Sequence, residues 1–207
     1  MKLDQDIVIV ATKNKGKVRE FEHAFAQLGK QVKSMFDYSD IPDVIEDGLT
    51  FAENALKKAK TVGDCLGLPV LADDSGLCVE ALNGQPGVYS ARYSGEHATD
   101  QLNNEKLLQE LVQLRLGEDT EQSLLSPASF VCSLVLYNPS SGEHLETSGS
   151  VAGWITSDVA GAGGFGYDPL FYLSQYDKTM AELSLEEKQS ISHRGVALRD
   201  LIAQLKK

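Results

Sequence analysis

The feature that most constrains the fold is a β-branched run followed by a lysine-rich loop and a helical pattern. Residues 7–11 read Ile-Val-Ile-Val-Ala, a composition typical of a buried parallel strand. After the loop at residues 12–17, large apolar side chains recur at helical spacing: Val18, Phe21, Phe25 and Leu28. Gly29 is suited to end this helix. A strand, a loop and a helix in this order predict an α/β protein with a functional first loop.

Two capping boxes predict the starts of further helices. Residues 50–53 form one box before a helix that extends to about Cys65. Residues 184–187 form the second, which is followed by a break at residues 192–195 and a final helix from about Val196.

The remaining segments complete a mixed α/β pattern. Residues 69–72 predict a strand that is followed by a turn at residues 73–76. Residues 128–137 and 143–151 predict an antiparallel hairpin. A helical period over residues 99–116 places leucines on its expected inner face: Leu102, Leu107, Leu108, Leu111 and Leu114. We therefore expect a mixed sheet, with parallel pairing early in the chain and antiparallel pairing later.

Composition limits the classes of partner. The chain has 207 residues and a formal net charge of −11, which suits a single domain spanning residues 1–207. Such acidity disfavours binding to polymeric nucleic acid or to a membrane surface, because both depend on Lys and Arg. Without a C-x-x-C pair, Cys65, Cys78 and Cys132 are expected to be buried thiols. The short apolar run after the N-terminal acids matches neither a signal peptide nor a membrane span, and predicts a cytoplasmic protein.

The first loop is a candidate anion site. Lys13, Lys15, Lys17 and Arg19 give residues 11–20 a net charge of +3 within an acidic chain. Free backbone N–H groups and the positive end of a helix dipole favour a phosphate there. The alternative is a lysine-rich, solvated helix start.

Two acidic pairs are candidates for a cation site. Asp73 and Asp74 are neighbouring carboxylates at the end of a predicted strand, and a cation or a proton would relieve their repulsion. Mg²⁺ prefers such oxygens and is usually shared with substrate phosphates. Glu46 and Asp47 could complete the site. An Asx-rich turn and a solvated loop are the alternatives.

A glycine-rich loop and a His-Arg pair are candidates for binding a base. Residues 161–166 match G-x-G-x-x-G, but a strand-like run follows where a dinucleotide site requires a helix. The loop could instead pass close to a ligand with Phe165 and Tyr167 available for stacking, or it could be an ordinary turn with core aromatics. His193 and Arg194 could donate hydrogen bonds to a heterocycle, or act as a cap. No phosphate-binding P-loop, zincin motif or hydrolase elbow occurs in the sequence.

Six segments together carry a family resemblance. They are residues 11–17, residues 50–55 with Lys58, and residues 72–77, 86–93, 163–169 and 192–195. In this order they resemble the inosine/xanthosine triphosphate pyrophosphatase family, whose members hydrolyse aberrant purine nucleoside triphosphates. The resemblance implies an α/β fold with a mixed sheet, two lobes, a substrate cleft between them, and usually a homodimer. It also implies Mg²⁺-dependent cleavage of ITP, dITP or XTP to the monophosphate and pyrophosphate.

The resemblance assigns roles to individual positions. Asp74 would be the catalytic proton acceptor and a metal ligand, with Asp73 beside it. The triphosphate would be held by the loop residues and by an assisting lysine: Thr12, Lys13, Asn14, Lys15, Gly16, Lys17 and Lys58. The other substrate contacts would be Ser75, Phe165, Gly166, Tyr167, Asp168, Lys188, His193 and Arg194, with Phe165 stacking on the base.

Selection of the base would follow from hydrogen-bond donors in the pocket. Donors from Arg194, His193 or the backbone would bind the keto oxygen of a deaminated purine. The amino group of adenine would face those donors unpaired, at a cost of roughly 1–3 kcal/mol per group.

One position departs from the family pattern. Members commonly have two acids before the glycine corresponding to Gly48, and here Ile45 occupies the first acid's position. The metal-ligand role therefore passes to Glu46, with Asp47 as a rival. Because this acid is missing, a non-catalytic nucleotide sensor is an alternative to the implied enzyme. A hydrolase of modified pyrimidine triphosphates is a second alternative.

Overall fold

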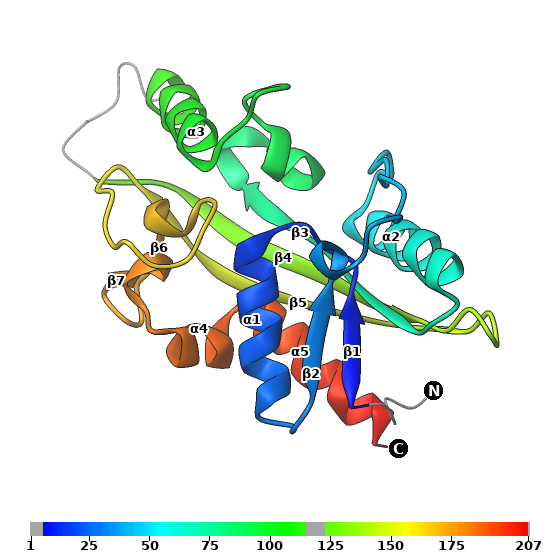
Figure 1. Cartoon of the computed structure of the whole chain (residues 1–207). Coiled ribbons are helices and arrows are strands. Elements are labelled where there is room, and N and C mark those ends of the chain that lie inside the picture. The colour runs from blue at the N-terminus through cyan, green and yellow to red at the C-terminus, as the bar shows by residue number, and fades with distance from the viewer. Residues whose placement is uncertain (1–5, 115–122, 207) are drawn as a thin grey trace. The chain divides into compact units, whose positions relative to one another are not determined.

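The structure, a computed structural model, describes residues 6–114 and 123–206 (Figure 1). Its strands are β1 (Ile7–Val10), β2 (Gln31–Ser34), β3 (Val70–Val79), β4 (Leu124–Tyr137), β5 (His144–Thr156), β6 (Phe171–Leu173) and β7 (Lys178–Thr179). Its α-helices are α1 (Lys15–Ala26), α2 (Phe51–Leu66), α3 (Asp100–Leu114), α4 (Leu185–Ile191) and α5 (His193–Leu205).

The strands form one mixed sheet in the order β2-β1-β3-β4-β5-β6-β7. β1 pairs in parallel with β2 and β3, whereas β6 pairs antiparallel with β5 and β7. Early parallel and later antiparallel pairing is therefore confirmed. The predicted hairpin is also confirmed, since β4 and β5 are neighbours and the Asn138 N–H donates to the Glu143 carbonyl at 3.0 Å.

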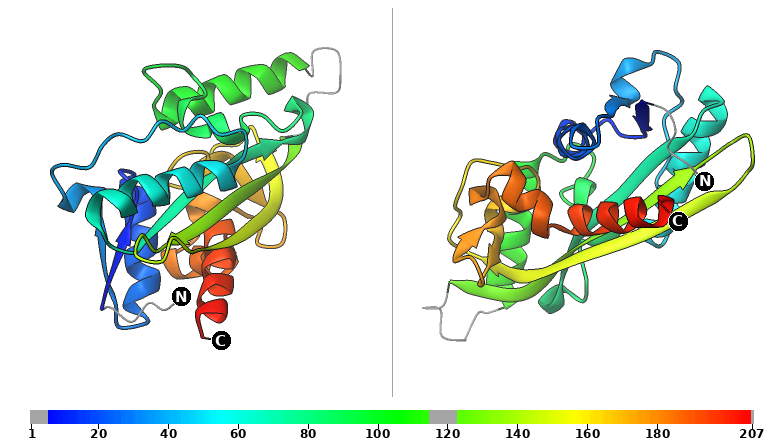
Figure 2. Two further views of the ribbon diagram at one scale, coloured as in Figure 1. Left: turned by 90° about the vertical axis from the view of Figure 1, so that its right-hand side faces the viewer. Right: turned by 90° about the horizontal axis from the view of Figure 1, so that it is seen from below.

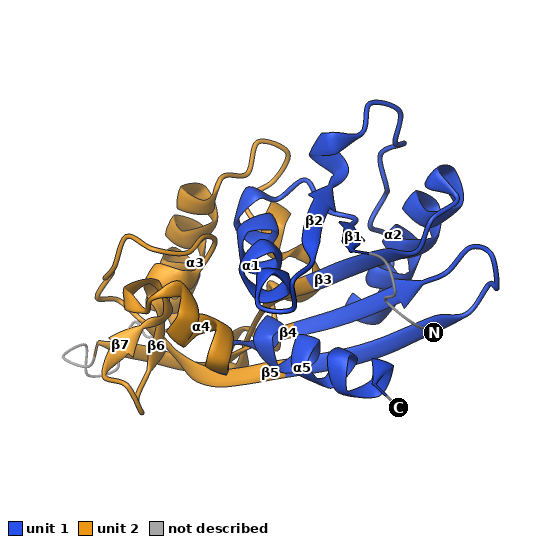
Figure 3. Ribbon diagram, turned by 60° about the horizontal axis from the view of Figure 1, so that its bottom comes forward, with its two compact units in different colours: residues 1–74, 132–149, 191–207 blue, residues 75–131, 150–190 orange. Residues whose placement is uncertain are grey.

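The chain divides into two compact units (Figure 3). Unit 1 comprises residues 1–74, 132–149 and 191–207, and unit 2 comprises residues 75–131 and 150–190. β3, β4 and β5 contribute residues to both units. Unit 1 holds β1, β2, α1, α2 and α5, whereas α3, β6, β7 and nearly all of α4 belong to unit 2.

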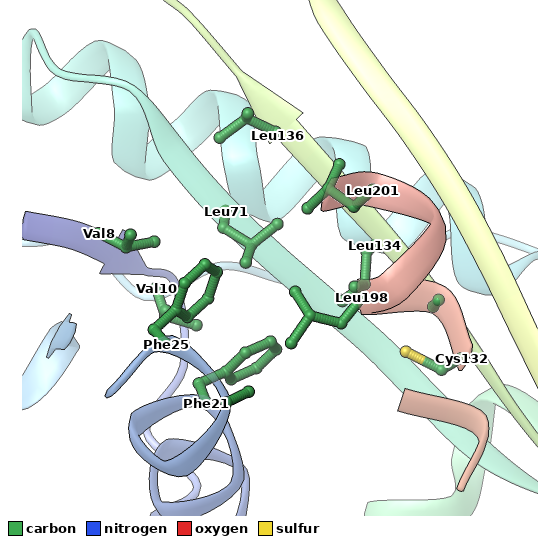
Figure 4. Close-up of a cluster of buried hydrophobic side chains, with 12 residues drawn as sticks. Val8, Val10, Phe21, Phe25, Leu71, Cys132, Leu134, Leu136, Leu198 and Leu201 are labelled. Carbon is green, nitrogen blue, oxygen red and sulfur yellow. The ribbon is translucent and has the colours of Figure 1, made fainter. Parts of the chain in front are cut away.

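Alternation along the strands builds two apolar layers in unit 1. Val8 and Val10 of β1 pack with Leu71 and with residues of α1 and α5, and Figure 4 shows this cluster around Phe21 and Phe25. Ile9 of β1, and Ala11 directly after the strand, face α2 instead. Side chains on a strand point to opposite faces in turn, so β1 is covered by helices on both sides, as its unbroken apolar run predicted.

Close packing holds α5 along the unit 1 part of β5 (Figure 2). Thr147 donates a hydrogen bond to the Ala197 carbonyl at 2.9 Å. A Cβ atom built on Gly149 would lie 2.3 Å from the His193 carbonyl oxygen, so only glycine permits this approach.

Both predicted capping boxes are confirmed. The Thr50 hydroxyl accepts from the Glu53 N–H at 3.1 Å and the Glu53 carboxylate accepts from the Thr50 N–H at 3.1 Å, which is a complete capping box. Ser184 and Glu187 form the same pair of bonds before α4. Gly67 ends α2 with a φ of 65°, in the left-handed region that glycine favours.

Three expectations about local structure are wrong. β3 runs without a break through residues 73–76, so these residues form no turn. The break before the last helix is a single N-cap residue, Ser192, and α5 begins at His193. Cys65 is exposed, although Cys132 is buried, and all three cysteines are free thiols.

The inner face of α3 also differs from the leucine pattern. Leu107 and Leu111 are buried as expected, but Leu102 and Leu114 are 44% and 58% exposed. Asn103 lies on the buried face instead, because its side chain bonds the Ser94 N–H at 2.8 Å and the Ser90 carbonyl at 3.3 Å. The predicted helix end at residues 115–116 lies outside the described residues.

Candidate functional site

The site in unit 1 is built on two adjacent aspartates whose side chains leave β3 on opposite faces. Asp73 lies on the same face of the strand as Leu71, which packs with α1 and α5. Asp74 lies on the face of Val70 and Ala72, which pack with α2. A strand's two-residue period separates the neighbouring carboxylates in this way, so each has its own set of partners.

Asp73 is a buried member of an ion-pair network. Its carboxylate accepts from Arg194 Nε at 3.0 Å, pairs with the Lys17 ammonium, and lies 3.1 Å from the Cys132 sulfur. Burial by itself would raise the pKa of Asp73, but the charges of Arg194, Lys17 and Lys58 hold it well below its usual value. Asp73 is therefore ionised and fully engaged.

Arg194 joins this network to α1. It is 1% exposed and also pairs with the carboxylate of Glu20, which is itself buried. Burial opposes its charge, yet Asp73 and Glu20 raise the pKa of Arg194 above its ordinary value. His193, the preceding residue, is 5% exposed in the first turn of α5.

Asp74 has a different environment. Lys58 Nζ lies 3.3 Å from Asp74 Oδ1 and 3.1 Å from Glu46 Oε2, so one buried ammonium bridges two carboxylates. Asn54 Nδ2 donates to Asp74 Oδ2 at 3.1 Å. Burial, with the nearby negative charge of Glu46, raises the pKa of Asp74, although Lys58 and Lys17 oppose the rise.

The pKa of Glu46 shifts in the opposite direction to that of Asp74. Burial would raise the pKa of its carboxyl, but Lys58 and Lys17 outweigh that effect and lower it. Its side chain is 32% exposed. Asp47, by contrast, is 66% exposed and pairs with Lys57 at 2.6 Å, away from Asp74. Of the two rival acids, Glu46 is the one beside Asp74.

The loop that carries Glu46 is fastened to α2 through Gly48. The Gly48 N–H donates to Asn54 Oδ1 at 2.8 Å, and a Cβ at Gly48 would lie 2.7 Å from that oxygen. Asn54 thus bonds the acidic loop with one end of its amide and Asp74 with the other. Asn54 lies in the segment 50–55 that carries the family resemblance, but no role was predicted for it. Its position four residues before Lys58, on the same helix face, was the available signal.

The first loop leads into α1 with the caps expected of a helix start. The side-chain oxygen Oδ1 of Asn14 accepts from the Lys17 N–H at 3.0 Å, and the Thr12 hydroxyl accepts from the Asn14 N–H at 3.1 Å. Lys13 pairs with Asp43 at the surface, at 2.5 Å. The side chain of Lys15 is exposed, whereas Gly16 is half-buried. Among these loop residues, Lys17 pairs with Asp73 of the acidic site.

In unit 2, an ion pair organises the glycine-rich loop. Asp168 Oδ2 accepts from the Phe165 N–H at 2.8 Å and from Lys188 Nζ at 2.6 Å. The Lys188 ammonium lies 4.8 Å from the centre of the Phe165 ring, within range of a cation–π contact. The Tyr167 ring is buried and its hydroxyl donates to the Ser90 carbonyl at 2.9 Å.

The predicted site residues thus fall into separate groups. Unit 1 brings together Lys17, Lys58, Asp73, Asp74, Glu46 and Arg194. Unit 2 brings together Phe165, Asp168 and Lys188, with Ser75 half-buried in β3 directly after Asp74. Glu20 of α1, which pairs with Arg194, was not predicted as a site residue. The available signal was that it is the one acid within the basic segment 11–20.

Neither group by itself forms a complete protein cage for a metal. Within the described ranges, no cluster of three or more His, Cys, Asp or Glu residues could hold an ion. Mg²⁺ needs only one or two carboxylates when substrate phosphates supply the other oxygens, so the pair Asp74 and Glu46 suits that ion. In residues 6–114 and 123–206, no helix is long and apolar enough to cross a membrane.

Comparison with known proteins agrees with this α/β fold. The Ham1 family model matches residues 8–204. A dITP/XTP pyrophosphatase of Geobacter sulfurreducens is 51% identical over 191 residues, 92% of each chain, and one of Halalkalibacterium halodurans is 50% identical over 93% of this chain and 95% of its own. The solved structure of the Staphylococcus aureus Ham1 protein is 42% identical, with a TM-score of 0.78 over 97% of this chain and 98% of its own.

The chain belongs to the Ham1 family. The resemblance drawn from the six sequence segments is thereby confirmed. So is the mixed α/β fold class, since a Coxiella burnetii HAM1 protein superposes with a TM-score of 0.81 at 38% identity, over 97% of this chain and 98% of its own.

We predict that Arg194→Ala destabilises the protein by about 3–5 kcal/mol, because it leaves the buried carboxylates of Glu20 and Asp73 without their shared cation. Urea unfolding of the variant and the parent measures the change. Arg199→Ala, on the exposed side of the same helix, is the control and should change stability by less than about 0.5 kcal/mol. Equal stability of both variants would contradict the network's structural role.

Proposed function

We propose that this chain hydrolyses the nucleoside triphosphates of deaminated purines, ITP, dITP and XTP, to the monophosphate and pyrophosphate. The observation that carries the proposal is Asp74, a buried carboxyl with a raised pKa beside Glu46, Lys58 and Asn54. The names of the Geobacter and Halalkalibacterium relatives, at 51% and 50% identity, support the choice of substrate.

The proposed cofactor is Mg²⁺, held by Asp74 and Glu46. The fit rests on two oxygen donors that already share a cation, the Lys58 ammonium, at 3.3 and 3.1 Å. When bound, the ion would neutralise phosphate charge and favour ionisation of an attacking water.

We assign the remaining chemistry in unit 1 to residues of the chain. Asp74 accepts the proton of the attacking water. Asn54 and Lys58 each hold one carboxylate oxygen and so fix its direction. The triphosphate binds the positive first loop, at Thr12, Lys13, Asn14, Lys15, Gly16 and Lys17, where charge neutralisation and alignment promote phosphoanhydride cleavage.

Recognition of the base is assigned to unit 2. Phe165 stacks on the base, while Lys188 and the backbone of residues 165–168 face its polar edge, with Ser75 touching substrate. Arg194 and His193 remain proposed nucleotide contacts. Because Asp73 and Glu20 engage the Arg194 guanidinium, we expect its larger effect to be positioning. A homodimer is proposed from the family resemblance.

A panel of triphosphates with Mg²⁺, read out by pyrophosphate release, tests the function. We expect rapid release from ITP, dITP and XTP, and much slower release from ATP and GTP. Preference for modified pyrimidine triphosphates would instead support the pyrimidine hydrolase. Binding without release from any triphosphate would support the nucleotide sensor and contradict the proposal.

We predict that Asp74→Asn lowers kcat for ITP about 10²- to 10⁴-fold, the range lost with a general base. The substitution keeps the side chain's size while removing its charge and basicity. Steady-state kinetics measure the loss, and thermal unfolding checks that the fold is retained. Near-parental turnover would exclude Asp74 as the proton acceptor.

We predict that Glu46→Gln raises the Mg²⁺ concentration needed for half-maximal rate by about 10–100-fold, the loss typical of a disturbed metal site. Asp47→Asn is the matched control, because Asp47 pairs with Lys57 at the surface and should leave the Mg²⁺ dependence unchanged. The opposite ranking of the two variants would transfer the ligand role to Asp47.

A further inference from the structure

Helix α3 forms hydrogen bonds with both backbone polar groups of one residue in the glycine-rich loop, Gly166. Asp100 Oδ2 accepts from the Gly166 N–H at 2.7 Å, and Asn104 Nδ2 donates to the Gly166 carbonyl at 3.0 Å. The two residues are one helical turn apart, so they lie on the same face of α3. We call this pair of bonds the α3 clamp.

The clamp fixes the backbone between the two aromatic residues of the loop. The Gly166 N–H and carbonyl belong to the peptide groups on either side of its Cα, so holding both restrains its φ and ψ together. Its φ is 61°, in the left-handed region where a side chain is disfavoured. The angle between the Phe165 and Tyr167 side chains therefore depends on the clamp.

Neighbouring bonds strengthen the same connection. Asn103, beside Asn104 on α3, donates to the Ser90 carbonyl at 3.3 Å, and the Tyr167 hydroxyl donates to the same oxygen at 2.9 Å. At the other end of the loop, Asp168 bonds the Phe165 N–H and Lys188. The loop is thus held by polar side chains at each peptide that sets the direction of Phe165.

One half of the Asn104 amide does not contribute to stability. Its carbonyl oxygen Oδ1 is buried and has no hydrogen-bond partner among the described residues. A buried acceptor without a partner costs about 1–3 kcal/mol, and such groups call for an explanation. Turning the amide over would not help, because Oδ1 would then face the Gly166 carbonyl. The donor group of Asn104 is the part that the loop uses.

We propose that Asp100 and Asn104 are positioning residues for base selection: they act through Gly166 to hold Phe165 and the loop backbone in the geometry that distinguishes deaminated purines from adenine. This inference rests on the proposed function. Neither residue touches substrate in it. Loss of the clamp lets the loop relax, so the preferred base loses more binding than the base that was already poorly bound.

Two substitutions, one isosteric and one truncating, test Asn104. Asn104→Asp keeps the side chain's shape but replaces the donor with an oxygen that repels the Gly166 carbonyl, and Asn104→Ala removes the group. Both should lower kcat/KM for ITP about 10- to 100-fold, mainly through KM, because small misplacements of binding groups have effects of this size. The ratio of kcat/KM for ITP to that for ATP should fall in both variants.

Asp100 allows a rescue experiment. Asp100→Ala removes the acceptor and should act like Asn104→Ala, whereas Asp100→Asn keeps an acceptor oxygen and should restore most of the ITP preference. Gln101 and Glu105 provide the matched control, because they form a 2.8 Å pair at the same spacing on α3 and are exposed. Gln101→Ala and Glu105→Ala should leave the ratio unchanged.

Hydrogen exchange of the Gly166 amide gives a readout that does not depend on activity. In protein labelled with ¹⁵N-glycine, this amide should exchange faster in Asp100→Ala than in the parent, and Asp100→Asn should restore protection. An unchanged exchange rate, or losses of kcat/KM that are equal for ITP and ATP, would overturn the inference. If the parent protein releases no pyrophosphate from any triphosphate, the proposed function fails and the selectivity role fails with it.

Discussion

The placement of two adjacent aspartates on a buried strand determines most of what unit 1 can do. Asp73 and Asp74 follow one another in β3, and the two-residue period of a strand sends their carboxylates to opposite faces. Asp73 meets Arg194 and Lys17, which keep it ionised, whereas Asp74 meets Lys58 and Asn54 and has a raised pKa. One carboxylate is therefore suited to structure and the other to proton transfer.

The structural aspartate also orients the helix that begins at the proposed phosphate loop. Lys17 and Glu20 are three residues apart on α1, so they lie on one face of it, and they pair with Asp73 and Arg194 respectively. Apolar packing of Phe21 and Phe25 secures the same face (Figure 4). Buried ion pairs of this kind contribute little net stability, but removal of one member is costly.

Sequence patterns predicted those features that depend on neighbouring residues. The capping box at Thr50 and Glu53 is complete within four residues, and the apolar run of β1 required helices on both faces. The turn predicted at residues 73–76 was wrong because the buried carboxylate of Asp73 is stabilised by Arg194, which lies 121 positions away. Distant partners also explain why Asn103, and not the predicted Leu102, lies on the inner face of α3: Ser90 and Ser94, which bond Asn103, come from another segment. Burial of a polar residue depends on such distant partners, and no local pattern contains them.

The proposed selection of a base by the glycine-rich loop depends on a fixed loop backbone. A keto oxygen and an amino group differ by about 1–3 kcal/mol per unpaired group, and this difference is available only if the facing donors cannot move to avoid the mismatch. Glycines alone would allow such movement. Here a Cβ at Gly164 would lie 2.0 Å from Asp168 Oδ2, so the backbone is pressed against the side chain that holds Lys188. With the α3 clamp on Gly166, the freedom of the glycines permits an unusual path, and the polar side chains around it then keep that path fixed.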